Sequence, residues 1–326
     1  MKKFFSFLMV FVALSVTCAK AQTSLIATLN HEGTLSTFYG STALQQAHEA
    51  AADGDVITLS SGTFASVDIT KAITLRGAGM FLDAETQTEP TVLANAFKIS
   101  ISDETTQKLT IEGVYSNQNI TINKLKNATF IKNRFANIDV QNGYGRNLTF
   151  IHCRNTGSVR DDTGDFSASF QNCIIASVYG KYFTFKNCIF ANNDLTYLYN
   201  NSEYKNCIIL KPYFNGDCSS STFYNNLYTD DGSFYITKSN NTNIKIATDD
   251  NRIKNLLNYY DDNDYKLTEE AKAIMKGTDG TEVGIYGGSL PYDPTPTNPQ
   301  ITKFNVASKT TADGKLSVDI EVKSAE

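Results

Sequence analysis

The chain has no tryptophan, three histidines and no CxxC pair in its 326 residues. Without paired cysteines, neither a zinc knuckle nor a thioredoxin-like centre is expected. Lysine and arginine form no block and the net charge is −5, so nucleic acid is not an expected partner, because phosphate binding needs clustered basic residues. The nucleophile-elbow, HExxH, P-loop and dinucleotide-binding fingerprints are also missing, which excludes several common enzyme classes.

Long apolar runs are confined to the N-terminus. A basic start precedes the apolar stretch Phe4–Val16, and Ala19–Ala21 forms a small-x-small cleavage site. This pattern predicts a signal peptide over residues 1–21 and a mature chain that is extracellular, on the cell surface or periplasmic. A lipoprotein anchored through Cys18 is the alternative interpretation. No later run approaches the roughly 18 apolar residues of a membrane span, so the mature chain is expected to have no transmembrane segment.

One six-residue phrase recurs along the middle of the chain. FQNCII, FKNCIF and YKNCII begin at Phe170, Phe185 and Tyr204. Weaker copies extend the frame into one aligned row: Asn133, Cys153, Cys173, Cys188, Cys207 and Asn226. The spacings within that row are 20, 20, 15, 19 and 19 residues, and a period near 20 is typical of a solenoid. Leucine-rich repeats share the period, but the segments here are short, alternating and rich in Thr, Ile, Phe and Tyr, which favours a parallel β-helix.

Each position of the phrase has a physical role in such a coil. Phe183 and Phe185 are two residues apart and point inward, whereas Thr184 between them points outward. The residue before each cysteine is expected at a bend with a left-handed backbone, and its amide is expected to bond to the stacked amide of the next coil: Asn172, Asn187, Asn206 and Asn225. The 15-residue step from Cys173 to Cys188 indicates either a coil without its usual loop or a break in the frame.

Cysteine is the small apolar filler at the next, inward position. Apart from Cys18 in the predicted signal peptide, an odd number of cysteines remains: Cys153, Cys173, Cys188, Cys207 and Cys218. Adjacent rungs of a β-helix lie about 4.8 Å apart, within reach of a disulfide. Stacked side chains are parallel, however, and a disulfide needs a dihedral near 90°, so buried thiols are favoured.

Both ends of the repeat carry distinctive segments. STALQQAHEAA predicts a helix with Ser41 as its N-cap, followed by ADGDVITLSSGTFASVDITKAITLRGAG. Near the other end lies DYKLTEEAKAIMKGTDGTEVGIYGG, residues 264–288. Over roughly residues 40–292 the chain resembles secreted bacterial proteins of the pectin-lyase-like superfamily. The resemblance implies an all-β fold: a right-handed parallel β-helix solenoid with an N-terminal capping helix.

The predicted organisation has five parts. Residues 1–21 are the signal peptide, 22–40 a leader of undefined structure, 41–292 the β-helix domain, 293–300 a Pro-rich linker, and 301–326 a β-hairpin tail. The tail is predicted from alternating apolar residues around an Asp-Gly turn. Two strands alone are marginally stable in water, so the tail is expected to dock on the solenoid, to pair with another protein or to be the start of a sandwich-like module.

The resemblance also directs attention to acidic polysaccharides. Lyases of this fold generally use calcium held by acidic residues, together with an Arg or Lys as the base. The loop VRDDTGDF supplies Arg160 as a candidate catalytic residue and Asp161, Asp162 and Asp165 as candidate calcium ligands. Ordinary loop formation by Asp and Gly is the alternative interpretation.

An outward row two residues before the cysteines contains further candidates. Lys186 and Lys205 are expected to stack on adjacent coils, where they would pair with a uronate carboxylate or act as a base. The alternative is that exposed lysines only keep the sheet soluble. His152 stands where the other coils have asparagine, so it is expected to replace asparagine at the bend.

Tyrosines provide a third kind of candidate. The run Tyr179, Tyr182, Tyr197 and Tyr199 would give sugar rings an apolar face with a polar edge. No complete set of base, metal ligands and stabilising cation can be assembled from the sequence. The expected function is therefore an exported, non-catalytic β-helix protein that presents an extended surface to a polysaccharide, a cell-surface glycan or a partner. A polysaccharide lyase or glycoside hydrolase acting on acidic polysaccharide is the alternative.

Overall fold

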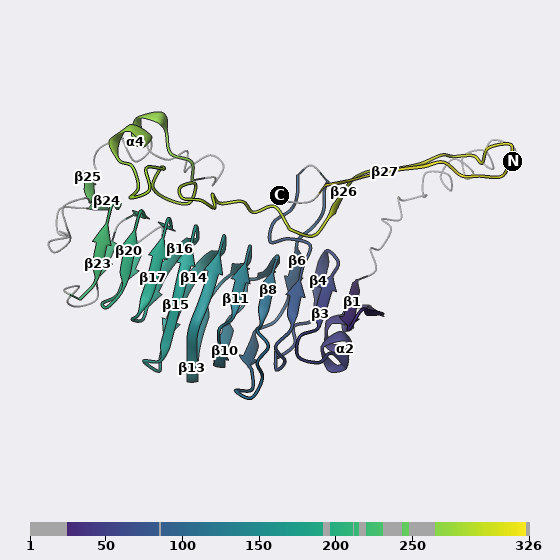
Figure 1. Cartoon of the computed structure of the whole chain (residues 1–326), viewed down its shortest axis with the longest axis horizontal. Coiled ribbons are helices and arrows are strands. Elements are labelled where there is room, and N and C mark those ends of the chain that lie inside the picture. Colours follow the sequence, from purple (N-terminus) through teal and green to yellow (C-terminus); the bar gives the residue numbers. More distant parts are fainter. Residues whose placement is uncertain are drawn as a thin grey trace, which may run out of the picture.

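A computed structural model describes residues 25–84, 86–191, 196–210, 212–214, 220–230, 243–247 and 265–323. The predicted signal peptide and Cys218 lie outside the described residues. The described chain forms an all-β solenoid of about eight turns with parallel strands, which confirms the predicted fold class (Figure 1). No helix among the described residues is long and apolar enough to cross a membrane.

The N-terminal end of the solenoid is covered by a hairpin and a short helix. β1 (Ile26–His31) and β2 (Thr34–Tyr39) pair antiparallel, and β1 also pairs antiparallel with β3 (Val56–Leu59), the first strand of the coils. Helix α2 (Ala43–Ala50) packs its small apolar face inward, as the sequence predicts. Its N-cap is Thr42 rather than the predicted Ser41. Much of the segment predicted to be a leader thus belongs to this cap.

Each coil contributes strands to three faces of the solenoid. The first face stacks β3, β5 (Thr74–Arg76), β8 (Thr110–Glu112), β11 (Thr129–Ile131), β13 (Ile138–Ile151), β15 (Phe166–Gln171), β17 (Phe183–Lys186), β20 (Glu203–Lys205) and β23 (Thr222–Tyr224). The second face stacks β4 (Gly62–Phe64), β6 (Thr91–Leu93), β9 (Val114–Ser116), β12 (Arg134–Phe135), β14 (Arg154–Asp161), β16 (Ile174–Tyr179), β18 (Ile189–Phe190), β21 (Ile208–Ile209), β24 (Leu227–Asp230) and β25 (Ile244–Ala247). The third face contains β7 (Phe97–Ser100), β10 (Ile120–Lys126), β19 (Thr196–Leu198) and β22 (Pro212–Phe214). β13, β14 and β16 cross a corner and contribute to this face as well.

Stacked aromatic rings fill the interior behind the first face. Phe130, Phe150, Phe170, Phe185, Tyr204 and Phe223 form one ladder, with neighbouring centroids 4.6, 4.7, 5.0, 5.0 and 4.7 Å apart. The 15-residue step from Cys173 to Cys188 keeps the predicted alignment of neighbouring coils, because Phe170 pairs with Phe185 and Ile174 with Ile189. The repeated phrase is therefore one rung of this ladder.

The cysteine row lies beside the ring ladder, buried and without disulfides. Cys153, Cys173, Cys188 and Cys207 are free thiols, as the parallel geometry predicts. Each thiol donates to the carbonyl of the aromatic residue one coil back, for example Cys188 Sγ to Phe170 O at 3.3 Å. Burial raises the pKa of Cys188 well above its usual range, so this thiol is held in its unreactive, protonated form.

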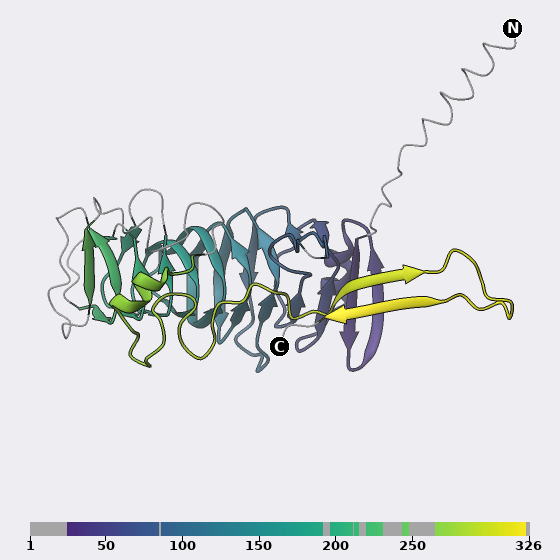
Figure 2. The ribbon, with the colours of Figure 1, turned by 90° about the horizontal axis from the view of Figure 1, so that it is seen from above.

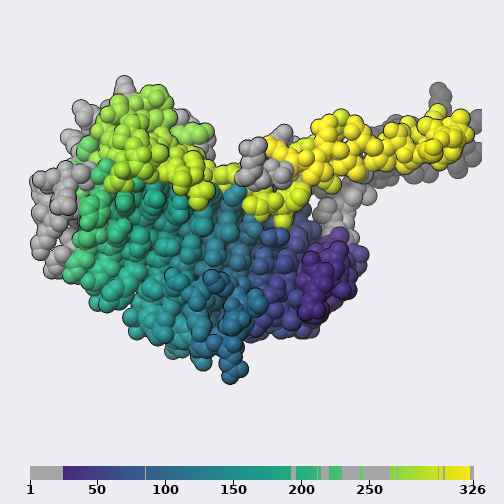
Figure 3. Space-filling view, viewed as in Figure 1, coloured from purple at the N-terminus to yellow at the C-terminus, as the bar shows by residue number. Residues whose placement is uncertain are grey.

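The bend before each cysteine has the predicted left-handed backbone. Its φ angle lies between 49° and 57° at Lys132, His152, Asn172, Asn187, Asn206 and Asn225. The prediction that these amides bond to one another is wrong. The side chains instead contact residues 276–298, here called the C-terminal strap, which runs back along the solenoid (Figures 1 and 3).

The strap contacts successive bends in reverse order. Asn225 Nδ2 donates to Lys276 O at 2.9 Å, Asn206 Nδ2 to Thr278 Oγ1 at 3.3 Å, Asn172 Nδ2 to Ile285 O at 2.7 Å, and Lys132 Nζ to Thr295 O at 2.7 Å. Between them, His152 Nε2 lies 3.0 Å from Leu290 O, so histidine fills an asparagine position as predicted. Residues predicted to be a Pro-rich linker thus lie on the solenoid.

The segment just before the strap covers part of the second face. Four outward residues of that face are buried, although they point away from the interior: Ile174, Ile189, Ile208 and Leu227. They form a second core with residues of helix α4 (Glu269–Ile274) and its flanks: Leu267, Ala271, Met275, Val283 and Ile285. Over these coils the second face is therefore closed to ligands.

The chain continues beyond the strap into a two-stranded ribbon. β26 (Gln300–Val306) and β27 (Val318–Lys323) pair antiparallel, which confirms the predicted hairpin. Gly314 has a φ of +77° at the predicted Asp-Gly turn. Lys303 bonds to Asp319 and Glu321 at 2.8 and 2.9 Å. Figure 2 shows the ribbon extending past the first coils.

Candidate functional site

The outward row of the first face holds the two candidate lysines. Lys186 pairs with Gln171 on one side and with Lys205 on the other, as the repeat predicts. Neither lysine makes an ion pair within the described residues, and both are half-buried. Arg160 is on the third face, so the structure does not bring the two lysines together with the predicted arginine and aspartates.

The third face carries a row of charged and aromatic side chains. Asp139, Arg160 and Tyr179 are in register on three successive coils. Tyr197 continues the row with its ring centroid 5.2 Å from that of Tyr179, and Tyr213 follows at 5.2 Å from Tyr197. The guanidinium carbon of Arg160 lies 5.3 Å from the Tyr179 ring centre, a cation–π contact. The row thus combines flat apolar rings with fixed charge over five coils.

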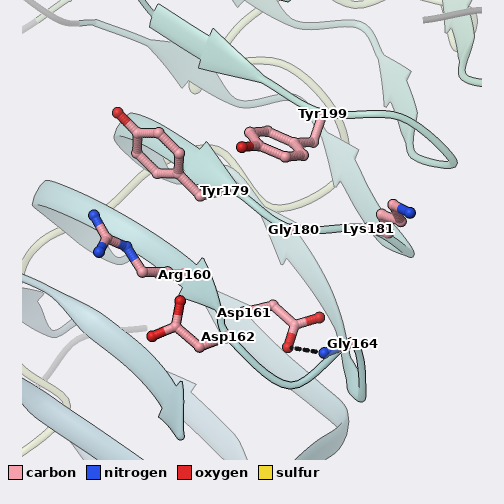
Figure 4. A pocket seen from close by; sticks show the side chains of 8 residues that line it. All are labelled: Arg160, Asp161, Asp162, Gly164, Tyr179, Gly180, Lys181 and Tyr199. Carbon is pink, nitrogen blue, oxygen red and sulfur yellow. Dashed lines mark hydrogen bonds between the residues drawn. The ribbon is translucent and has the colours of Figure 1, made fainter. Parts of the chain in front are cut away.

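A surface cavity of about 340 Å³ opens beside this row. It is lined by Arg160, Asp161, Asp162, Gly164, Tyr179, Gly180, Lys181 and Tyr199 (Figure 4). Asp162 lies on the same side as Arg160, whereas Asp161 turns back toward Gly164. The structure therefore gathers several predicted site residues, and Lys181 joins them although the sequence did not single it out.

The three predicted calcium ligands have different tasks. Asp161 Oδ1 accepts from Thr163 N, Thr163 Oγ1 and Gly164 N at 2.8–3.0 Å, so it stabilises its own turn. Asp165 forms a two-bond pair with Arg146 at 2.7 and 2.5 Å, and this pair lowers the pKa of Asp165. No group of three His, Cys, Asp or Glu side chains is placed to hold a metal among the residues that the structure describes. Within the described ranges, the three aspartates do not come together as a calcium ligand set.

The four candidate tyrosines do not all belong to the site. Tyr179, Tyr197 and Tyr199 are neighbours, with the rings of Tyr179 and Tyr199 centred 5.8 Å apart. Tyr182 lies at the following corner with a left-handed backbone and a 58% exposed side chain, and it does not line the cavity. Three of the four are therefore placed to touch one ligand.

Asp139, next to Arg160 in the row, is a second residue, besides Lys181, that the sequence did not single out. Its side chain is buried, and burial raises its pKa; the neighbouring Asp162 raises it further, while Arg160 opposes the shift. A signal was present, because Asp139 precedes Arg160 by 21 residues, close to one coil. The spacing of the cysteine row did not predict the alignment of Asp139 with Arg160, because turns of different length join the first face to the third.

The buried Asp139 makes a pH-dependent contribution to stability. Its pKa in the folded chain lies above the ordinary value of 3.8, so the unfolded chain ionises first as the pH rises. Folding stability attributable to this group is therefore highest below that value and falls as the pH rises through the raised pKa. We expect the Asp139→Asn variant to lose less stability than the wild type between acidic and neutral pH. Urea unfolding across that range tests this, and parallel curves for the two proteins would contradict it.

Comparisons with protein-family models, curated proteins and solved structures gave no match for this chain. The geometry nevertheless defines a class of protein: a parallel β-solenoid with one face partly covered by its own C-terminal segment and another bearing a charged and aromatic row. Because a fold alone does not determine an activity, the function is argued from the residues of that row.

Proposed function

We propose that the protein is exported through its N-terminal signal peptide and binds an acidic polysaccharide or cell-surface glycan along its third face, without cleaving it. The row formed by Arg160, Tyr179, Tyr197 and Tyr213 carries this proposal. A tyrosine ring offers an apolar surface to the face of a sugar, and its hydroxyl bonds at the edge. Rings repeated coil after coil suit an extended ligand better than a compact one.

The charges beside the rings favour an acidic ligand. Arg160 and Lys181 are exposed cations at the cavity, and neither forms an ion pair within the described residues. Asp162 is exposed at the same cavity, and the buried Asp139 is in register with Arg160 on the preceding coil. A uronate carboxylate next to Arg160 would gain a charge-assisted, two-bond contact. The parallel solenoid and its N-terminal helix also support membership of the pectin-lyase-like superfamily as part of this proposal.

Affinity electrophoresis through gels that contain neutral or uronic-acid polysaccharides tests the proposal. Tyr179→Ala and Tyr197→Ala should each weaken binding roughly tenfold or more, because aromatic residues at the centre of a contact carry much of its free energy. Tyr39→Ala is the matched control, since Tyr39 is 64% exposed on β2 at the N-terminal cap. Retardation of all three variants to the wild-type extent would refute the assignment of the third face.

A glycoside hydrolase is the second candidate, favoured by the pair Asp139 and Asp162. Hydrolases use one carboxyl that keeps its proton and one that is ionised. Burial raises the pKa of Asp139, which suits a general acid, while the exposed Asp162 would act as a base or nucleophile. Release of reducing ends from a uronic-acid polysaccharide, lost in both Asp139→Asn and Asp162→Asn, would establish cleavage. The absence of product from every polysaccharide in the panel would leave binding as the function.

A further inference from the structure

Two arginines on the second face have no partner for their charge among the residues that the structure describes. Arg134 on β12 and Arg154 on β14 are in register on adjacent coils, and both are half-buried. Neither guanidinium donates a hydrogen bond or forms an ion pair within the described residues, and Arg134 Nε is fully buried without an acceptor. By contrast, Arg76 and Arg146 each pair with a carboxylate.

Aromatic rings surround both guanidinium groups. The ring of Phe81 lies 5.6 Å from Arg134 Cζ and 5.9 Å from Arg154 Cζ, so one ring contacts both cations. Tyr115 lies 4.6 Å from Arg134, and Tyr265 lies 5.9 Å from Arg154. These contacts hold the side chains in place and keep water from part of their surface. Like charges directly opposite one another on neighbouring strands repel, and the rings do not supply the acceptors that ten N–H donors require.

The strap adds a third unpartnered group at the same place. The hydroxyl of Tyr292 is buried without a hydrogen-bond partner in the described part of the chain, and its ring packs edge-on against His152 at 5.9 Å. Burial raises the pKa of Tyr292, and the nearby Arg154 opposes that rise. The phenol therefore remains a neutral donor near Arg154, one member of the arginine pair.

We propose that Arg134, Arg154 and the hydroxyl of Tyr292 form a binding site for a single oxoanion group, a carboxylate or sulfate. Adjacent strands lie about 4.8 Å apart, so two oxygens of one such group can accept from both guanidinium forks. The anion relieves the repulsion between the cations and supplies acceptors for donors that the protein leaves unsatisfied. The site is on the second face, so it is independent of the polysaccharide surface proposed for the third face.

Small anions test the site on the full chain. Thermal unfolding is measured in sodium sulfate, sodium phosphate and sodium glucuronate, with sodium chloride at matched ionic strength as the baseline. A ligand that binds only the folded chain raises the midpoint in a saturable way. We expect such a rise with at least one of the three, and the anion with the lowest dissociation constant identifies the preferred group as sulfate, phosphate or carboxylate.

Variants separate this site from general charge effects. Arg134→Gln and Arg154→Gln should each weaken anion binding roughly tenfold, and Arg154→Lys should weaken it less, because lysine keeps the charge but loses the two-bond fork. Arg146→Gln is the control, because Arg146 already pairs with Asp165, and it should bind as the wild type does. Circular dichroism checks that each variant is folded. A rise no larger than the chloride baseline, or binding unchanged in both glutamine variants, would overturn the proposal.

Discussion

The Phe185→Ala variant is expected to lose about 3–5 kcal/mol of unfolding free energy, the usual cost of deleting a buried aromatic side chain. Phe185 is fully buried and stacks between Phe170 and Tyr204, with centroids 5.0 Å away on both sides. Its removal interrupts the ring ladder in the middle. In a solenoid each coil is stabilised mainly by its neighbours, so one broken rung weakens the contact between the coils on either side.

Urea unfolding followed by circular dichroism measures this loss. Thr184→Ala is the matched control, because Thr184 is the exposed neighbour on the same strand. A surface change of that kind usually alters stability by at most about 0.5 kcal/mol. If the two variants unfolded at the same urea concentration, the stacked ladder would not be the main source of cohesion between coils.

The second large effect is expected at Asn172, which ties the strap to the solenoid. Its Nδ2 donates to Ile285 O at 2.7 Å and to Gly287 O at 2.8 Å, and its φ is +49°. Asn172→Ala leaves the Gly287 carbonyl without its donor, whereas Ile285 O keeps its bond from Tyr292 N. It also replaces asparagine with a residue that tolerates the left-handed bend less well. Together these costs are expected to reach about 2–4 kcal/mol. Asn172→Gly should lose about 1 kcal/mol less unfolding free energy than Asn172→Ala. Glycine also lacks the side-chain amide, but it adopts the left-handed backbone without strain.

Asn147 provides the control for backbone conformation. Its φ is +53°, but it is exposed, and its amide donates to Asn127 Oδ1 rather than to the strap. Asn147→Ala should therefore cost only the left-handed strain, about 1 kcal/mol. Thermal and urea unfolding compare the three variants. Equal losses for Asn172→Ala and Asn147→Ala would show that these strap contacts add nothing to stability.

The interior of the solenoid was predictable because its signals are local and repeated. An aromatic residue, a polar residue, a bend residue and a cysteine recur every coil, and each type suits one position. Asparagine tolerates the left-handed bend better than most residues, so the bend row followed from chemistry as well as spacing. The same period placed Lys186 above Lys205 correctly.

The strap was not predictable from that pattern. The contact between Asn172 and Ile285 joins residues 113 positions apart, and nothing in a repeat indicates what its bend side chains will touch. The expectation that the amides bond to one another failed where the strap offered acceptors instead, as it does at Asn172, Asn206 and Asn225. Turns of variable length between the faces likewise kept the sequence from indicating that Asp139 pairs in register with Arg160 on the third face.

The position of the site follows from which faces remain open. The strap and the segment before it cover the bends and much of the second face, where outward residues such as Ile189 are fully buried. The first face presents a row that includes two lysines, whereas the third face combines tyrosine rings, cations and a cavity. Repeated residues build the interior, and the outward third-face residues are where the account places ligand binding.

Hydroxyl-radical footprinting with mass spectrometry tests that placement most directly, with and without the polysaccharide that retards the wild type most strongly. Because the chain has no tryptophan, tyrosines are its main reactive aromatic probes along with phenylalanine. The account predicts protection of Tyr179, Tyr197 and Tyr213 by the ligand, with Tyr39 and Tyr224 unchanged. Protection of Tyr224 on the first face, with the three third-face tyrosines unaffected, would contradict it.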